Sequence, residues 1–169
     1  MKSGPTHAVC LLLGSNEGNR TQLLKRAVNF IKKEIGIIIN KSSVYETSPW
    51  GFVADVDFLN QVLYVETSLS AKEILIRALK VEQKLGRIRA KEHFTSRTMD
   101  IDMLFYDSEV INRKELAVPH PKLHLRRFAL EPMAEILPDL IHPVLGKPIK
   151  KLLQDCKDTG KVKVYSAHL

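Results

Sequence analysis

The sequence predicts an α+β fold: a ferredoxin-like βαββαβ core with an antiparallel sheet and α/β/α layers, followed by C-terminal additions. The first observation behind this prediction is the order of the apolar segments, which read as strand, helix, strand, strand, helix and strand. The second is the length of 169 residues, because it suffices for one hydrophobic core and is short for two. We therefore expect one domain over residues 1–169.

Local signals place the first half of this core. An apolar strand at about residues 7–13 runs into a polar loop, and a helix to about Glu34 follows, with Asn19 as its expected N-cap. The β-branched segment 37–46 reads as one further strand.

The second half begins with a strand at about 59–67. Ser70 and Glu73 form a capping box that opens the next helix, and Gly86 ends it. A long loop reaches Thr98, and the last strand of the core follows. The expected C-terminal additions are a hairpin around Glu109–Asn112, a helix near 126–136 and, over 161–169, a strand or a frayed tail.

The composition describes a basic protein, with 26 Lys and Arg against 19 Asp and Glu, a net charge of +7 and a pI near 9.4. This surplus suits an anionic ligand, either nucleotide phosphates or nucleic acid. Cys10 and Cys156 are too few for a disulfide framework, so we expect free thiols. The apolar run 8–13 is too short to span a bilayer. A cytoplasmic protein without a membrane partner is the expectation.

Two aspartates interrupt the last apolar strand. Asp100 and Asp102 are two residues apart, so their side chains share one face, while Ile101, Met103 and Phe105 form the opposite, core-facing row. Because like charges on one strand repel, a cation is expected between them. Mg²⁺ fits, since it combines one or two carboxylates with substrate phosphates. The alternative is an exposed strand face with two solvated carboxylates.

The loop before this strand is rich in cations. Arg87, Arg89, Lys91 and Arg97 lie within a few residues of the aspartate pair. Arginine forks match phosphate oxygens, and loops of this length are usually functional or disordered. Cations beside metal-binding carboxylates suit phosphoryl transfer, and a solvated basic loop is the alternative. The sequence lacks P-loop and protein-kinase motifs, so such chemistry belongs to another class.

Two further segments are candidate binding elements. His120 lies between two prolines, which stiffen its backbone, and close to basic residues. The alternative is an inert surface histidine. Trp50, Phe52 and Phe58, followed by Asn60, could hold a flat heterocycle through stacking and paired hydrogen bonds. Each aromatic taken singly also suits an ordinary core position.

Several motifs together resemble the 6-hydroxymethyl-7,8-dihydropterin pyrophosphokinase family over about residues 8–153. This resemblance implies a Mg²⁺-dependent diphosphotransferase of folate biosynthesis, which transfers pyrophosphate from ATP to the pterin hydroxymethyl group and releases AMP. The motifs are Gly14-Ser15-Asn16, Gly86-Arg87-x-Arg89, Arg97-Thr98-x-Asp100-x-Asp102, and Val118-Pro119-His120-Pro121 with Arg126-x-Phe128.

The same resemblance implies a role for individual residues. Asp100 and Asp102 would hold two Mg²⁺ ions and, with Arg87 and Arg97, form the catalytic centre. The residues implied in ATP binding are Glu82, Arg87, Arg89, Arg97, His120 and Arg126. Those implied in pterin binding are Thr47, Ser48, Trp50, Phe58, Asn60 and Phe128, with the two phenylalanines on either side of the ring.

Two other functions remain open from the residues alone. An RNA-binding ferredoxin-like module would need an aromatic sheet signature that the sequence lacks, and the paired aspartates would repel nucleic acid. A metal-dependent nucleotide hydrolase would use the aspartates without a pterin pocket. We expect small-molecule substrates, no nucleic-acid partner, and a monomer.

Overall fold

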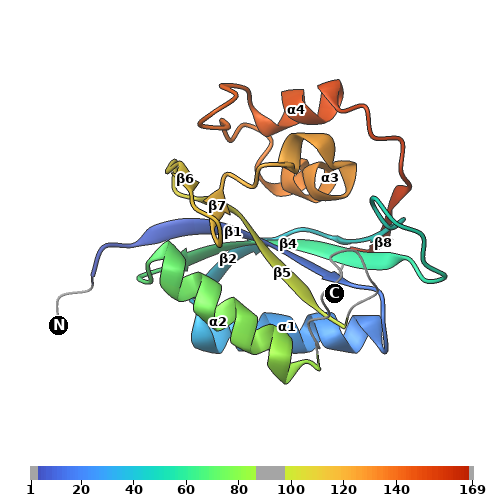
Figure 1. Ribbon diagram of the computed structural model, residues 1–169, viewed down its shortest axis with the longest axis horizontal. Coiled ribbons are helices and arrows are strands. Elements are labelled where there is room, and N and C mark those ends of the chain that lie inside the picture. The colour runs from blue at the N-terminus through green and yellow to red at the C-terminus, as the bar shows by residue number, and fades with distance from the viewer. Residues whose placement is uncertain (1–3, 87–97, 168–169) are drawn as a thin grey trace.

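A six-stranded antiparallel sheet forms the middle layer of the protein, and helices cover both of its faces (Figure 1). The computed structural model describes residues 4–86 and 98–167. Helices α1 (Arg20–Glu34) and α2 (Ala71–Lys84) lie on one face, and α3 (Arg127–Ile136) and α4 (Ile149–Asp155) lie on the other. The α+β class and the three layers are therefore confirmed.

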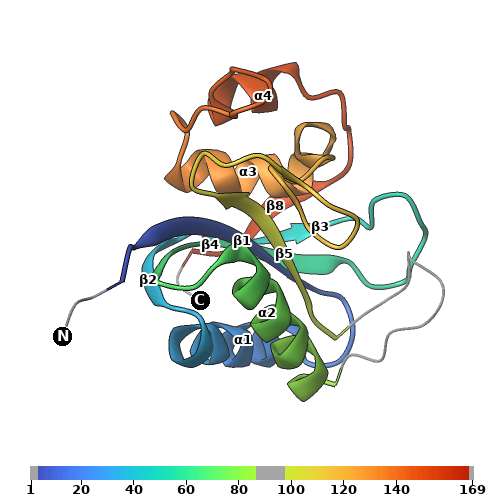
Figure 2. The ribbon, with the colours of Figure 1, turned by 60° about the vertical axis from the view of Figure 1, so that its left-hand side comes forward.

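The strands follow the ferredoxin-like order. β1 lies between β5 and β4, so α1 and α2 each connect two strands that are separated by a third (Figure 2). β2 and β3 both pair with β4, and β8 adds to β3. The strands of the sheet are β1 (His7–Ser15), β2 (Ile37–Lys41), β3 (Val44–Thr47), β4 (Phe58–Thr67), β5 (Asp100–Tyr106) and β8 (Val162–Ser166). Outside the sheet, β6 (Ile111–Asn112) pairs with β7 (Ala117–Val118), and a 3₁₀ turn, η1 (Leu123–Leu125), precedes α3.

The helix starts are those that the sequence indicates. The Asn19 side chain accepts a hydrogen bond from the backbone N–H of Gln22, 3.1 Å away, at the start of α1. At α2, Ser70 and Glu73 accept from each other's backbone N–H and form the expected capping box. Among the described residues, none of the helices combines the length and the apolar character that crossing a bilayer requires.

β1 is buried on both sides, which explains its continuous apolar sequence. Val9, Leu11 and Leu13 pack against α1 and α2, whereas Cys10 and Leu12 pack in the core beneath α3 and α4. A strand with helices on both faces needs apolar side chains at every position.

The prediction that Ile101, Met103 and Phe105 face the same core is wrong. Ile101 and Met103 belong to the core on the α1 and α2 face, but Phe105 belongs to the core on the opposite face. Cys10 pairs with Phe105 while Leu11 pairs with Met103, so Leu104 is an extra residue in β5. This β-bulge inverts the alternation beyond Leu104, which a period of two does not anticipate.

The segment expected to be one strand over 37–46 forms two. Lys41 pairs with Leu63 and Tyr45 with Asn60, so four steps along β2 and β3 oppose three along β4. The break is held by Ser42, whose backbone N–H donates to Val62 O and whose Oγ accepts from Val62 N, both at 2.9 Å. At the C-terminus, residues 162–166 form β8, which settles the choice between strand and tail, whereas the sequence did not predict α4.

Candidate functional site

The two aspartates lie on an edge strand at the open end of the sheet. Within residues 4–86 and 98–167, β5 pairs with β1 alone in the sheet, and Asp100 and Asp102 stand opposite Gly14 and Leu12. All four residues line one pocket, so both aspartate side chains share a face, as their spacing predicts. Among the described residues, no group of three or more His, Cys, Asp or Glu could enclose a metal ion. A pair of carboxylates suits Mg²⁺, which keeps water and phosphate oxygens in its shell.

The pocket lies on the α3 side of the sheet and holds about 510 Å³, part of which opens to solvent. Its walls come from four neighbouring strands (β5, β1, β4 and β3), the loop between β3 and β4, and the start of α3. They are formed by Leu12, Gly14, Thr47, Ser48, Trp50, Phe52, Phe58, Asn60, Asp100, Asp102, Arg126 and Phe128. All six residues expected to bind the pterin therefore line the same pocket as the aspartate pair.

A buried amide forms the floor of this pocket. Asn60 Nδ2 donates to Thr47 Oγ1 over 2.5 Å, and both side chains are almost fully buried. This bond orients the amide and leaves its oxygen toward Gly14, where an added Cβ would come within 2.7 Å of Asn60 Oδ1. Gly14 therefore keeps the space above the amide open.

Aromatic rings and cations form the upper wall. The Arg126 guanidinium carbon lies 4.7 Å from the centre of the Trp50 ring and 5.6 Å from that of Phe128. These are cation–π distances, and Lys122 approaches Trp50 as well, at 5.8 Å. Arg126, which the resemblance assigned to ATP, is thus placed among the aromatic residues assigned to the pterin.

His120 lies beside the pocket and not in its wall. Its backbone N–H donates to Leu104 O of β5 over 2.9 Å, and its Nδ1 accepts from Lys122 N at 3.2 Å. Burial, with the nearby charges of Arg126 and Lys122, lowers the pKa of His120 to about 4, although Asp100 acts in the opposite direction. The imidazole is therefore neutral at pH 7.

Glu82 is buried beneath the aspartate strand. Its Oε1 accepts a hydrogen bond from Ile101 N over 2.9 Å, and Ile101 lies between the two aspartates in the chain. An edge strand leaves such backbone N–H groups without a ladder partner. Glu82 therefore holds the backbone that carries the carboxylate pair.

The predicted and the observed site differ in several residues. Arg87, Arg89 and Arg97 lie outside the described residues, so their expected phosphate contacts have no structural counterpart here. Leu12 lines the pocket without having been chosen from the sequence, whereas Phe52 lines it as a member of the predicted aromatic cluster. Phe52 was visible as part of the aromatic cluster, and it meets Phe58 edge to face at 6.0 Å between ring centres. The position of Leu12 follows only from strand register.

The comparisons with known proteins agree with this geometry. The model of the family described as 7,8-dihydro-6-hydroxymethylpterin-pyrophosphokinase (HPPK) matches residues 10–138. A pyrophosphokinase for 2-amino-4-hydroxy-6-hydroxymethyldihydropteridine from Aquifex aeolicus is 45% identical over 146 residues, which cover 85% of this chain and 88% of the relative. The enzyme of the same name from Bacillus subtilis is 39% identical over 127 residues, 75% of each chain.

Solved structures agree on the fold. A crystal structure of Plasmodium falciparum HPPK-DHPS superposes with a TM-score of 0.76 at 17% identity, over 90% of this chain and 46% of the other. The family model and the relatives define a pyrophosphokinase, and in this chain a carboxylate pair lines the same pocket as a cluster of aromatic side chains. The chain belongs to the 6-hydroxymethyl-7,8-dihydropterin pyrophosphokinase family.

Proposed function

We propose that the pocket binds the pterin and that Asp100 and Asp102 hold two Mg²⁺ ions beside it, where the triphosphate of ATP is cleaved. The reaction follows from family membership: the enzyme transfers a pyrophosphoryl group from ATP to hydroxymethyldihydropterin in folate synthesis. The hydroxymethyl oxygen forms a bond to the β-phosphorus, the bond from that phosphorus to the α-phosphate oxygen breaks, and AMP leaves.

One observation carries the proposal: the carboxylate pair and the ring-binding residues line a single pocket. A pterin on the Asn60 side of this pocket would extend its hydroxymethyl group across β1 toward the aspartates of β5. Alignment of the reacting groups is worth several kcal/mol in bimolecular reactions. When bound, Mg²⁺ would supply charge stabilisation to the phosphate oxygens.

The ring is held by complementary polar and aromatic groups in our proposal. The Asn60 amide and the Thr47 hydroxyl offer donor and acceptor atoms in the buried floor, where hydrogen bonds discriminate strongly because unpaired groups are costly. Phe58 and Phe128 contact the faces of the ring. Trp50 and Ser48 close the pocket from the loop that follows β3.

The phosphates are bound by cations in our proposal. Arg87 and Arg97 neutralise the transferred group, Arg89 assists them, and Arg126 approaches the nucleotide from the pocket wall. His120 keeps its proton on Nε2, because Nδ1 accepts from Lys122 N, and Nε2 can donate to a phosphate oxygen. Glu82 contributes to ATP binding indirectly, because it holds the backbone of β5 that carries the aspartate pair.

We also propose that the enzyme works as a cytoplasmic monomer. Cys10 and Cys156 are free thiols in the structure, which is typical of a reducing compartment.

The test measures AMP after incubation of the protein with ATP, Mg²⁺ and 6-hydroxymethyl-7,8-dihydropterin. We expect AMP and the pterin diphosphate in equal amounts, and none without the pterin or the metal. Hydrolysis of ATP that does not depend on the pterin would support the nucleotide hydrolase instead. Tight RNA binding without turnover would support the binding module.

A further inference from the structure

The pocket has two walls, which touch where the Arg126 guanidinium lies over the Trp50 ring, and a third segment also connects them. One wall is the loop 48–57 between β3 and β4, which carries Ser48, Trp50 and Phe52, and the other is the start of α3 with Arg126 and Phe128. The segment 156–166, which runs from the end of α4 through β8, lies beyond the residues that the family model matches. We call this segment the strap.

The strap holds the loop wall at both of its ends. Ser48 N donates to Lys161 O at 3.1 Å, and Lys161 N donates to Ser48 Oγ at 3.0 Å, which extends the β3–β8 ladder by one residue. Lys161 Nζ reaches Asp57 Oδ2 at 2.5 Å, at the other end of the loop, and Glu46 Oε1 at 3.8 Å. One residue of the strap therefore fixes both the entry and the exit of this loop.

A second group of contacts attaches the strap to the α3 wall. Arg127, which lies between the pocket residues Arg126 and Phe128 in sequence, donates from its backbone N to Asp158 Oδ2 at 3.1 Å. Its Nε donates to Asp158 O at 2.8 Å, and Nη2 donates to Cys156 O at 3.1 Å. The first turn of α3 is thereby fixed to the strap through three bonds.

The turn that joins these two groups of contacts is compact. Asp158 Oδ1 accepts from Gly160 N at 2.9 Å, so the two oxygens of one carboxylate bond the α3 wall and the strap's own turn. A Cβ on Gly160 would meet Asp158 Oδ1 at 3.1 Å and Ser48 Oγ at 3.2 Å, which leaves little room for movement. The turn thus transmits the position of one wall to the other.

We infer that the strap sets the distance between the two walls of the pocket, and that Lys161 and Asp158 are positioning residues for the flat heterocyclic substrate. The inference rests on the proposed pterin site. Neither side chain touches the pocket, so their effect comes through preorganisation of Ser48, Trp50 and Phe128. The Lys161–Asp57 pair is partly exposed, and such pairs add little to global stability.

The experiment compares Lys161→Ala and Asp158→Asn with the wild-type enzyme in the AMP assay. We expect the KM for the pterin to rise about fivefold to tenfold in each variant, with kcat within about twofold, because the ring site loses preorganisation. The KM for ATP should stay within about twofold in Lys161→Ala, whose contacts are with the loop wall, whereas Asp158→Asn acts on the wall that also carries Arg126. Lys161→Arg restores the contact with Asp57 and should recover most of the pterin affinity. Circular dichroism melting verifies that each variant is folded.

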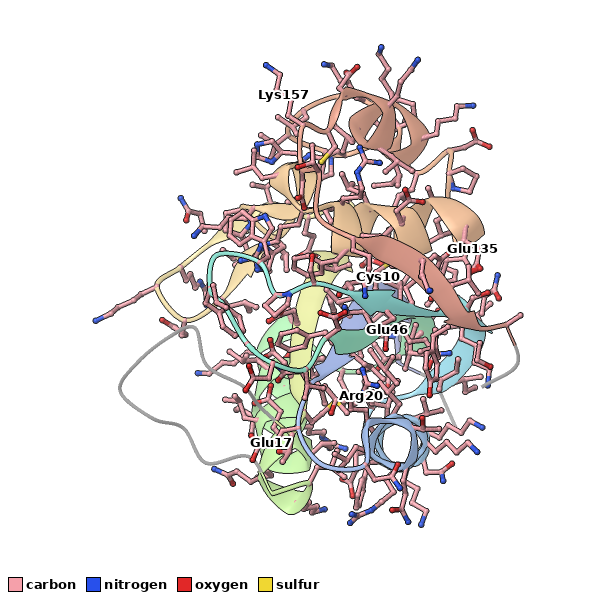
Figure 3. All side chains as sticks on the ribbon, turned by 90° about the vertical axis from the view of Figure 1, so that its right-hand side faces the viewer. Cys10, Glu17, Arg20, Glu46, Glu135 and Lys157 are labelled. Carbon is pink, nitrogen blue, oxygen red and sulfur yellow. The ribbon has the colours of Figure 1, made fainter. Side chains whose placement is uncertain are left out.

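Lys157→Ala is the matched control. Lys157 is an exposed lysine of the same strap, far from Arg20 and Glu46 near the loop wall (Figure 3), and its removal should leave all constants unchanged. A pterin KM that stays constant in both folded test variants, or one that rises in Lys161→Ala together with the KM for ATP, would overturn the inference. Failure of the wild type to form AMP would instead overturn the proposed function. Asp158→Asn acts on the opposite wall and keeps the test decisive if Lys161→Ala does not fold.

Discussion

The two faces of the sheet differ in how completely helices cover them. On the face of α1 and α2, a continuous core includes Leu11, Leu24 and Ile74, all fully buried. On the face of α3 and α4, the core around Leu104 and Leu130 covers only part of the sheet. Beyond it, the strand ends line the pocket.

Helix length explains this difference. α1 and α2 have 15 and 14 residues, whereas α3 and α4 have 10 and 7. At a rise of about 1.5 Å per residue, the first pair spans about 21–22 Å and the second only about 10–15 Å. The uncovered strand ends on the second face can therefore carry polar groups such as Asn60 and Asp100 without burying them under a helix. The site lies where the layer formed by α3 and α4 ends.

Asp100→Ala gives the largest expected loss of function on the open face. We expect turnover to fall at least about 10³-fold, because the variant loses half of the proposed Mg²⁺ site. Stability should stay the same or rise slightly, since one of two neighbouring like charges is removed. AMP release titrated against Mg²⁺, together with urea unfolding, measures both effects. Near-normal turnover would exclude the metal assignment.

Leu11→Ala makes the corresponding change on the covered face of the sheet, where we expect an effect on stability and none on substrate binding. Leu11 is fully buried between the sheet and the two longer helices. The free energy of unfolding should fall by about 2–5 kcal/mol, while the folded fraction keeps its KM for the pterin. If both KM and stability changed in this variant, the two faces would not be independent.

Sequence periodicity predicted the covered face well. Its strands and helices carry their own local signals, such as the capping box of Ser70 and Glu73 and the stripe that buries Ile74. The aspartate pair was also predictable, because a two-residue spacing on a strand fixes a common face. These features depend on neighbours within one element.

The remaining features depend on contacts between distant segments. The bulge at Leu104 arises from pairing with β1, and the break near Ser42 arises from pairing with β4, so neither has a signal in its own segment. α4 has only seven residues and lies among prolines, which hides its periodicity. The contacts of Lys161 join segments more than a hundred residues apart, and no local pattern announces them.

Gly14→Ala tests how closely the open face fits its ligand. The new Cβ would lie 2.7 Å from Asn60 Oδ1, so the amide must move from its position beside Thr47. We expect the KM for the pterin to rise about tenfold or more, with a smaller change in the KM for ATP. Gly4→Ala is the control, because no atom lies within 4 Å of its added Cβ. An unaltered pterin KM in Gly14→Ala would show that the ring does not bind beside Asn60.

His120→Gln should have the smallest effect, and it concerns stability against pH. Burial lowers the pKa of His120 from 6.5 to about 4, so between these values the unfolded chain binds a proton that the folded chain does not. His120 therefore does not reduce the free energy of unfolding above about pH 6.5. Below that pH, the free energy of unfolding falls as the pH drops toward 4. We expect the wild type to lose about 1–3 kcal/mol more than the variant between pH 7 and pH 4.5, measured by urea unfolding. Equal losses in the two proteins would mean that His120 is solvated at the edge of the open face, and its neutral imidazole could then not be assigned to phosphate binding.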